Sequence, residues 1–366
     1  MAKSSDPFGL VNSTIAGRYA VEQVVGEGGF SVVYRARHTL WKHPVAIKAF
    51  RGFEALDSEA RDGLLRAFVQ EGAILAELSE RTTAVVQARD TATLVTPGGD
   101  WVPYLVLEWL EGETLEALLW HERRVGLPPR TLGEAVGFLD PLARALALAH
   151  SKGICHRDLK PGNVFVLGDA RGEDRAVKLL DFGTAGVFFD PRRTLSERWT
   201  ALQASGFTPL YGAPEQFSAS YGVTGPWTDV FALALIFVEL LVGRQPMGDG
   251  LPHELARAAT DPRRRPTPRA LGRAIPDSVE SVFVRALAVY PAERWQTAGS
   301  FWRALHEAMT AAPCEPAPAP SQRPLRVAPA AAFAIALTMA ASVISDHRVG
   351  RAVASRPRAV ASSSTR

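Results

Sequence analysis

The sequence predicts an α+β protein in which a small, mainly β part precedes a larger helical part. The first observation is a series of short, valine-rich strand patterns within residues 19–108. The second is that helical patterns dominate from Thr114 onward. The third is one charged segment, residues 154–166, that lies between apolar runs. Charges in such a place need partners, so we expect this segment to line a cleft.

Composition bounds the class of protein. Hydrophobic residues make up 47% of the 366 residues and charged residues 22%, as in a globular protein long enough for two compact units. The net charge of +3 gives no case for nucleic-acid binding. The two cysteines, Cys155 and Cys314, lie far apart in the sequence and in different surroundings, so we do not expect a disulfide framework. We therefore expect the protein to be in a reducing compartment, the cytoplasm. No signal peptide is visible in the polar residues 1–14.

The β part begins with two strands joined by a glycine-rich segment. Residues 19–25 predict the first strand, and the second starts at Val32. The glycines between them would let the backbone approach a ligand with its amides turned inward, although an ordinary hairpin is the alternative. Residues 44–50 predict a third strand, whose alternation sets Lys48 opposite its immediate neighbours. A lysine among apolar residues needs a carboxylate partner if it is to stay there.

A helix predicted over residues 57–80 offers that partner. Glu71 falls on the apolar side of this helix, together with Phe68 and Leu75, and a glutamate there is costly unless it is paired. Glu77 is the competing candidate, but it lies off the apolar stripe.

The remaining elements follow in order. Strands over 85–96 and 104–108, joined by a turn at 97–100, complete the β part. The helical part is expected to contain a core helix at 132–151, a hairpin of 165–167 and 177–180, a buried helix at 228–242 and a last helix at 297–310. The run at 228–242 is too short to span a membrane and contains Glu239.

The charged segment carries the chemistry. Asp158 can take a proton from a hydroxyl, and Lys160 can neutralise phosphate charge. Asn163 and Asp181, which directly follows the hairpin, supply oxygens of the kind that Mg²⁺ prefers. Together these groups indicate phosphoryl transfer to a hydroxyl.

Several motifs resemble those of the eukaryotic-type serine/threonine protein kinases found in bacteria. Residues 156–163 read H-R-D-L-K-x-x-N, residues 45–48 read V-A-I-K, and residues 181–183 read D-F-G. Residues 26–33 follow G-x-G-x-x-G-x-V except that Ser31 replaces the third glycine, and residues 206–215 follow G-T-P-x-Y-x-A-P-E with Phe207 inserted. The resemblance covers residues 19–310 and implies a two-lobed protein kinase fold, with a small mainly β N-lobe and a larger α-helical C-lobe.

The resemblance also implies a role for each matching residue. Lys48, held by Glu71, would orient the α/β-phosphates of ATP, and Asp158 would position and deprotonate the substrate hydroxyl. Lys160 would offset γ-phosphate charge, while Asn163 and Asp181 would hold Mg²⁺. The remaining residues expected around ATP are Gly26, Glu27, Gly28, Gly29, Phe30, Val33, Ala46, Glu108 and Leu110. A further pairing, structural in kind, is implied between Arg294 and Glu215.

The expected partners are protein substrates, with a possible homodimer for trans-autophosphorylation, and not nucleic acid. Two other classes remain open. A pseudokinase would be a nucleotide-binding signalling scaffold, but its usual sign is loss of the lysine or of an aspartate, and both are present here. A small-molecule phosphotransferase would not need the polar segment 184–215 or its closing motif.

That polar segment matches the family's activation segment, and phosphorylation within it is expected. Arg157 directly precedes Asp158 and can form a bidentate pair with a phosphate. The favoured acceptors are Thr200 and Ser205, ahead of Thr194 and Ser196. Hydroxyls that merely solvate a loop are the alternative.

The chain is expected to divide into an N-terminal extension (1–18), an N-lobe (19–110), a C-lobe (111–311), a Pro/Ala-rich linker (312–326), a possible transmembrane helix (327–345) and a basic tail (346–366). The run at 327–345 carries no charge and is barely long enough to span a bilayer. A helix on an anionic membrane surface and a disordered tail are the alternatives. The kinase domain itself is expected in the cytoplasm.

Overall fold

The computed structural model describes residues 6–28, 31–51, 58–172, 174–181 and 209–311. These residues belong to one compact unit, Met1–Cys314. Residues 327–345 lie outside the described residues. No helix among the residues described is long and apolar enough to cross a membrane.

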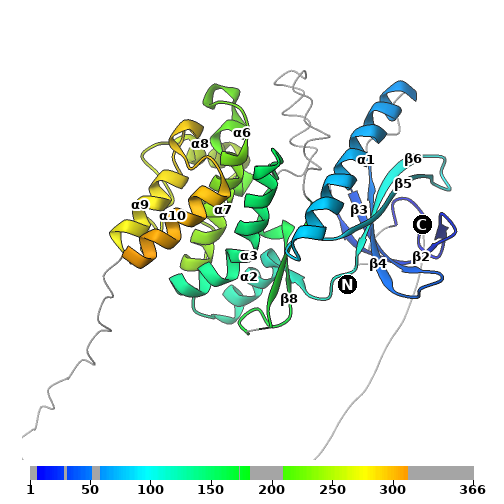
Figure 1. Ribbon diagram of the computed structural model, residues 1–366, viewed down its shortest axis with the longest axis horizontal. Coiled ribbons are helices and arrows are strands. Elements are labelled where there is room, and N and C mark those ends of the chain that lie inside the picture. Colours follow the sequence, from blue (N-terminus) through cyan, green and yellow to red (C-terminus); the bar gives the residue numbers. More distant parts are fainter. Residues whose placement is uncertain (1–5, 29–30, 52–57, 173, 182–208, 312–366) are drawn as a thin grey trace, which may run out of the picture. The chain divides into compact units, whose positions relative to one another are not determined.

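The N-terminal part is a six-stranded antiparallel sheet with the strand order β1-β2-β3-β4-β6-β5. Its strands are β1 (Thr14–Ile15), β2 (Tyr19–Glu27), β3 (Ser31–His38), β4 (Pro44–Phe50), β5 (Ala88–Val95) and β6 (Trp101–Glu108). The sheet has a core of its own, and Tyr34, Ile47 and Tyr104 are fully buried in it. One long helix, α1 (Ser58–Arg81), lies beside the sheet (Figure 1).

The strands expected in this part all form, with shifts in their bounds. β6 begins at Trp101, three residues before the expected start, and the later start of β5 has a clear cause. The strand expected at 85–96 enters the sheet only at Ala88. Val85 and Val86 pair instead with Leu179 of the helical part, since Val86 N donates to the Leu179 carbonyl at 3.0 Å and Leu179 N donates to the Ala84 carbonyl at 2.7 Å. This short ladder ties the two parts together through backbone hydrogen bonds.

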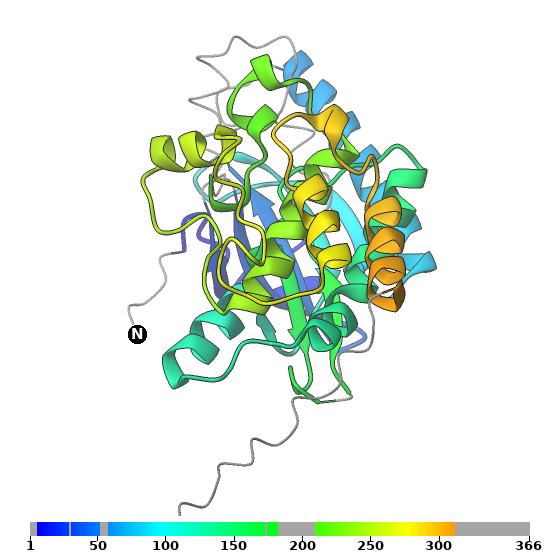
Figure 2. The same ribbon diagram turned by 90° about the vertical axis from the view of Figure 1, so that its left-hand side faces the viewer.

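The C-terminal part is mainly helical. Its helices are α2 (Leu115–Val125), α3 (Leu132–Ser151), α6 (Pro214–Phe217), α7 (Pro226–Val242), α8 (Pro252–Thr260), α9 (Asp277–Ala286) and α10 (Ala298–Ala311). A small sheet of β7 (Glu113–Thr114), β8 (Val164–Leu167) and β9 (Ala176–Leu179) completes it. Figure 2 looks onto these helices with the strands of the large sheet behind them.

Helix α7 is the centre of this core. Its side chains are buried from Thr228 to Leu241, which explains why its sequence is apolar all round rather than on one face. Buried Glu239 is the exception, and it is paired with Arg123 at 2.8 Å and accepts a hydrogen bond from the Tyr211 hydroxyl. The expected helix at 228–242 is therefore confirmed as a core helix.

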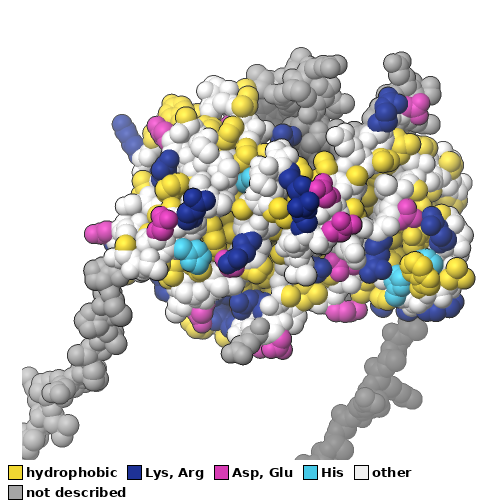
Figure 3. Space-filling model, in the orientation of Figure 1, with side chains coloured by type: hydrophobic (Ala, Val, Ile, Leu, Met, Phe, Trp, Pro, Cys, Tyr) yellow, Lys and Arg dark blue, Asp and Glu magenta, His cyan; other side chains and the backbone are white. Residues whose placement is uncertain are grey.

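The surface carries charges of both signs. On the face drawn in Figure 3, Lys and Arg side chains alternate with Asp and Glu side chains. Among the described residues, three ion pairs join the two parts of the molecule: Glu77 of α1 with Lys152, Glu108 of β6 with Lys178 of β9, and Lys48 of β4 with Asp181.

Candidate active site

The loop after α3 is held in place by one buried carboxylate at the start of α7. Asp229 accepts hydrogen bonds from His156 N at 2.8 Å and from Arg157 N at 2.7 Å. Asp229 therefore caps two amides of this loop. Arg157 is held at φ 64°, in the left-handed region that non-glycine residues rarely adopt. This turn directs the chain into Asp158.

The three polar side chains predicted for this loop come together. Lys160 Nζ lies 2.9 Å from Asp158 Oδ2. Asn163 Nδ2 donates to the Asp158 carbonyl at 2.7 Å and to Asp158 Oδ2 at 3.3 Å. Both side-chain donors approach Oδ2, which leaves Oδ1 available to a hydroxyl.

Asp181 joins this group from the end of β9. The Leu180 N–H donates to the Asn163 carbonyl at 2.8 Å, so the residue after Leu180 lies beside the loop. Burial by itself would raise the pKa of the Asp181 carboxyl. Attraction to the ammonium of Lys48, whose Nζ lies 2.5 Å from Oδ1, outweighs burial and lowers that pKa below its ordinary value. Asp181 is therefore a carboxylate near neutral pH.

The donor set fits a hard cation. Because the Asn163 amide nitrogen is engaged with Asp158, the amide oxygen is the atom left to bind a cation. Together with the Asp181 carboxylate it provides two oxygen ligands. Within the described ranges no cluster of three His, Cys, Asp or Glu side chains could hold a metal. Proteins commonly bind Mg²⁺ with one or two side-chain oxygens, and phosphate oxygens and water complete the coordination.

Lys48 lies on β4 with 7% of its surface exposed, and the ion pair that the structure records for it is the one with Asp181. Glu71 lies within α1, but its side chain is outside the described part of the structure. Glu77, the competing partner weighed from the sequence, pairs with Lys152 instead. The pairing of Lys48 with Glu71 thus stays a prediction.

The glycine-rich segment joins β2 to β3 as expected. Gly26 pairs with Val33 in the sheet, and Gly28 N donates to the Ser31 carbonyl at 2.8 Å. Gly29 and Phe30 lie outside the described residues. Glu27 forms an ion pair with Arg51 at 2.7 Å, which engages one of its carboxylate oxygens.

The expected adenine pocket lies where β4 and β6 pair. Ala46 pairs with Leu107, one residue before Glu108. The Glu108 carboxylate is bound by Lys178 Nζ at 2.5 Å and by Gln87 N at 2.8 Å. Both contacts engage the same carboxylate oxygen, Oε1. Leu110 follows as a partly buried side chain against the main core.

The closing motif of the polar segment is anchored by a buried ion pair. Arg294 binds Glu215 bidentately, at 2.9 and 2.8 Å, and neither side chain is exposed. This pairing is confirmed as the sequence predicted it. Residues 182–208, which include the expected phosphate acceptors and Thr208, lie outside the described residues.

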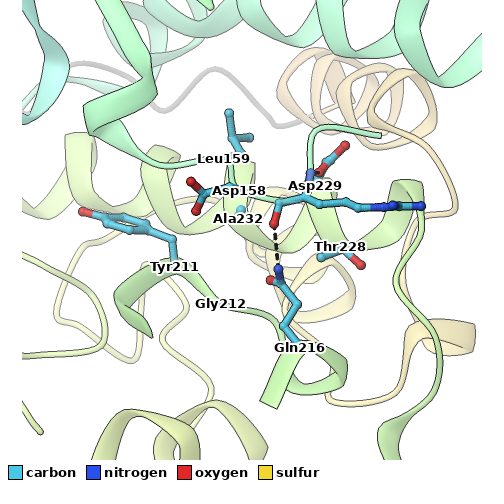
Figure 4. A pocket seen from close by; sticks show the side chains of 9 residues that line it. Asp158, Leu159, Tyr211, Gly212, Gln216, Thr228, Asp229 and Ala232 are labelled. Carbon is cyan, nitrogen blue, oxygen red and sulfur yellow. Dashed lines mark hydrogen bonds between the residues drawn. The ribbon is translucent and has the colours of Figure 1, made fainter. Parts of the chain in front are cut away.

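Beside Asp158, a pocket opens between the loop, α6 and α7 (Figure 4). Its lining includes Asp158, Tyr211, Gln216 and Asp229. The sequence had not indicated Gln216, whose side-chain amide reaches the loop. No motif marks this residue, because its partner is a backbone carbonyl far away in the sequence.

Comparison with known proteins agrees with this geometry. The family model described as the protein kinase domain matches residues 19–298. The serine/threonine-protein kinase Pkn1 of Myxococcus xanthus is 33% identical over 297 residues, which cover 80% of this chain and 38% of Pkn1. The serine/threonine-protein kinase PknB of Mycobacterium tuberculosis is 30% identical over 288 residues, covering 78% of this chain and 42% of PknB.

Among solved structures, the kinase domain of Mycobacterium tuberculosis PknI, crystallised as a double mutant, superimposes with a TM-score of 0.56 at 25% identity. The match covers 84% of this chain and 99% of that domain. The chain spans about two fifths of the length of the curated relatives named above.

Proposed function

The chain belongs to the protein kinase family, and from this premise we propose that it transfers the γ-phosphoryl group of ATP to serine or threonine hydroxyls of proteins. The observation that carries the proposal is the meeting of Asp158, Lys160 and Asn163 in one loop, with the pair of Lys48 and Asp181 beside it. The relatives Pkn1 and PknB carry the name of serine/threonine-protein kinases, which supports this acceptor class.

Each residue then has a physical task. Asp158, fixed by Lys160 and Asn163, orients the acceptor hydroxyl and takes its proton as the new bond forms. Lys160 offsets negative charge on the transferred group. Lys48 binds phosphate oxygens, and the backbone of the segment from Gly26 covers them. Bound Mg²⁺, held by Asn163 and Asp181, would supply neutralisation of the phosphate charge.

The partners follow from the same proposal. Protein substrates would include a second copy of this chain, whose serine and threonine hydroxyls belong to the same acceptor class. The low number of cysteines and the absence of a disulfide framework in the sequence support a cytoplasmic kinase domain. The uncharged run at 327–345 supports membrane contact through that segment.

The test is incubation of the purified chain with γ-labelled ATP and Mg²⁺, followed by mapping of phosphosites. The Asp158→Asn variant removes the proton acceptor at nearly constant volume, so we expect kcat to fall by about 10²- to 10⁴-fold while nucleotide still binds. Asp249→Asn, on an exposed residue with no role in the site, is the matched control. Wild-type turnover in Asp158→Asn would exclude the mechanism, and ATP-dependent labelling of small molecules alone would favour a small-molecule phosphotransferase.

A further inference from the structure

The side-chain amide of Gln216 is fixed by a hydrogen bond at each end. Its Nε2 donates to the carbonyl of Arg157 at 2.7 Å, and its Oε1 accepts from Ala213 N at 3.0 Å. Figure 4 shows this side chain reaching from α6 to the loop that carries Asp158. A glutamine suits this place because it presents a donor and an acceptor at once.

The bond acts on a strained part of the backbone. Arg157 has φ 64°, and its N–H donates to Asp229 Oδ1 at 2.7 Å. A left-handed non-glycine residue persists only where its surroundings hold it in place. The carbonyl of Arg157 belongs to the peptide bond that leads into Asp158. The orientation of that peptide therefore sets the direction of the Asp158 side chain.

We propose that Gln216 is a positioning residue for phosphoryl transfer, which holds the Arg157–Asp158 peptide so that the Asp158 carboxylate faces the acceptor hydroxyl. The inference rests on the proposed kinase function. Gln216 directly follows Glu215, whose pair with Arg294 anchors this turn. Through the side-chain amide of Gln216, the anchored closing motif of the polar segment thereby fixes the position of Asp158, the proton acceptor.

Two substitutions separate positioning from mere support of the fold. Gln216→Met keeps the length of the side chain and removes the donor, so we expect kcat to fall by about 10- to 100-fold with the KM for ATP unchanged. Gln216→Glu keeps the acceptor for Ala213 N and donates to the Arg157 carbonyl only when the new carboxyl is protonated. The charged groups lining the same pocket are Arg157, Asp158 and Asp229.

The readout is the ratio of the variant's kcat to the wild-type kcat between about pH 6 and about pH 8.5. For Gln216→Glu we expect this ratio to rise several-fold toward the acid end, because acidification restores the donor; for Gln216→Met it stays low throughout. Gln296→Glu is the matched control, since Gln296 also donates to backbone carbonyls, of Pro291 and Arg294, but away from Asp158. Its ratio should stay flat and close to one.

The outcomes are distinct. Wild-type kcat in Gln216→Met overturns the proposal, and so does an equal loss in both Gln216 variants without recovery on acidification. A loss that appears in KM for ATP rather than in kcat also overturns it. If the wild-type chain transfers no phosphoryl group while binding Mg²⁺ and ATP, the kinase function itself fails and this inference falls with it.

Discussion

Arg157 shows how the geometry of the site depends on a single residue. Its left-handed backbone brings Asp158 out of the loop, and two hydrogen bonds, to Asp229 and from Gln216, hold that conformation. The guanidinium of Arg157, unlike its backbone, has a nitrogen without a hydrogen-bond partner among the described residues. The Nε atom is buried and makes no hydrogen bond to any residue that the structure describes. A buried donor of this kind is costly, so an acidic ligand that reaches it would be bound favourably.

Cys155 lies two residues before Arg157, and the reactivity of its thiol tests the surroundings of the loop that carries Asp158. Burial raises the pKa of its thiol to about 11, and the negative charge of Asp229 acts in the same direction. The thiolate is the reactive form, and an ordinary cysteine has a pKa of about 8.5. At about pH 8 we therefore expect Cys155 to react with iodoacetamide about 100-fold more slowly than a free cysteine. Its rate should rise about tenfold per pH unit up to about pH 10.

The measurement is peptide mass spectrometry of the native chain over a pH series. The same chain in guanidinium serves as the control, because unfolding removes both causes and Cys155 should then titrate normally. A plateau near pH 8.5 in the native chain would show that the thiol is not buried against Asp229 as the structure has it.

At the scale of elements, local pattern predicted most of the architecture. The bounds of β4 and α3 were predicted to the residue. In α3 the local signal is the capping box of Thr131 and Glu134 at its start. The start of β5 was predicted wrongly, since Val85 and Val86 pair with Leu179 of β9, a contact that no local pattern reveals. Tertiary pairing decides such cases.

In the site, too, residues that share a local motif could be predicted, and those that depend on distant contacts could not. Asp158, Lys160 and Asn163 could be found because they share one short motif, and Asp181 because it follows a hairpin directly. Gln216 could not be found, since its role depends on a carbonyl 59 positions away. The pairing of Lys48 with Asp181 was likewise not predicted, because two oppositely charged residues far apart in the sequence carry no joint signal.

The segment between Asp181 and Pro209 is the element on which regulation is predicted to act. A phosphate there carries roughly −1.5 to −2 charges at neutral pH and can bind the guanidinium of Arg157. A hydrogen bond to a charged group contributes about 1.5–3 kcal/mol, so we expect loss of the phosphate to reduce activity at least about tenfold. Thr200 and Ser205 are the favoured acceptors.

The test combines mass spectrometry of active protein with a variant in which Thr194, Ser196, Thr200 and Ser205 are all alanine. Asp158→Asn shows whether the phosphates are the chain's own product. Ser218→Ala with Ser220→Ala, both outside the segment and near the surface, controls for the loss of hydroxyls. Full activity of the fourfold variant would leave Arg157 with a structural role only.

The described part of the molecule ends with α10, which packs on the core through Phe301 and Leu305. A chain that stops at Ala311 therefore retains every described contact of the fold and of the site. The residues beyond it differ sharply in composition: a proline-rich stretch, an uncharged run at 327–345, and then five arginines. Attachment to a membrane is a property we expect to reside in that portion alone.

We predict that the full chain sediments with membranes and that a chain of residues 1–311 does not, while both phosphorylate the same substrate. A helix over 327–345 would be about 28 Å long at 1.5 Å per residue, close to the ~30 Å hydrocarbon core of a bilayer. A spanning helix resists carbonate extraction, whereas a surface-bound basic tail is released by salt because its attraction is electrostatic. A variant with Arg348, Arg351, Arg356, Arg358 and Arg366 changed to glutamine separates these cases, since it should lose surface binding but keep a span. Recovery of the full chain only in the supernatant would exclude both modes of attachment.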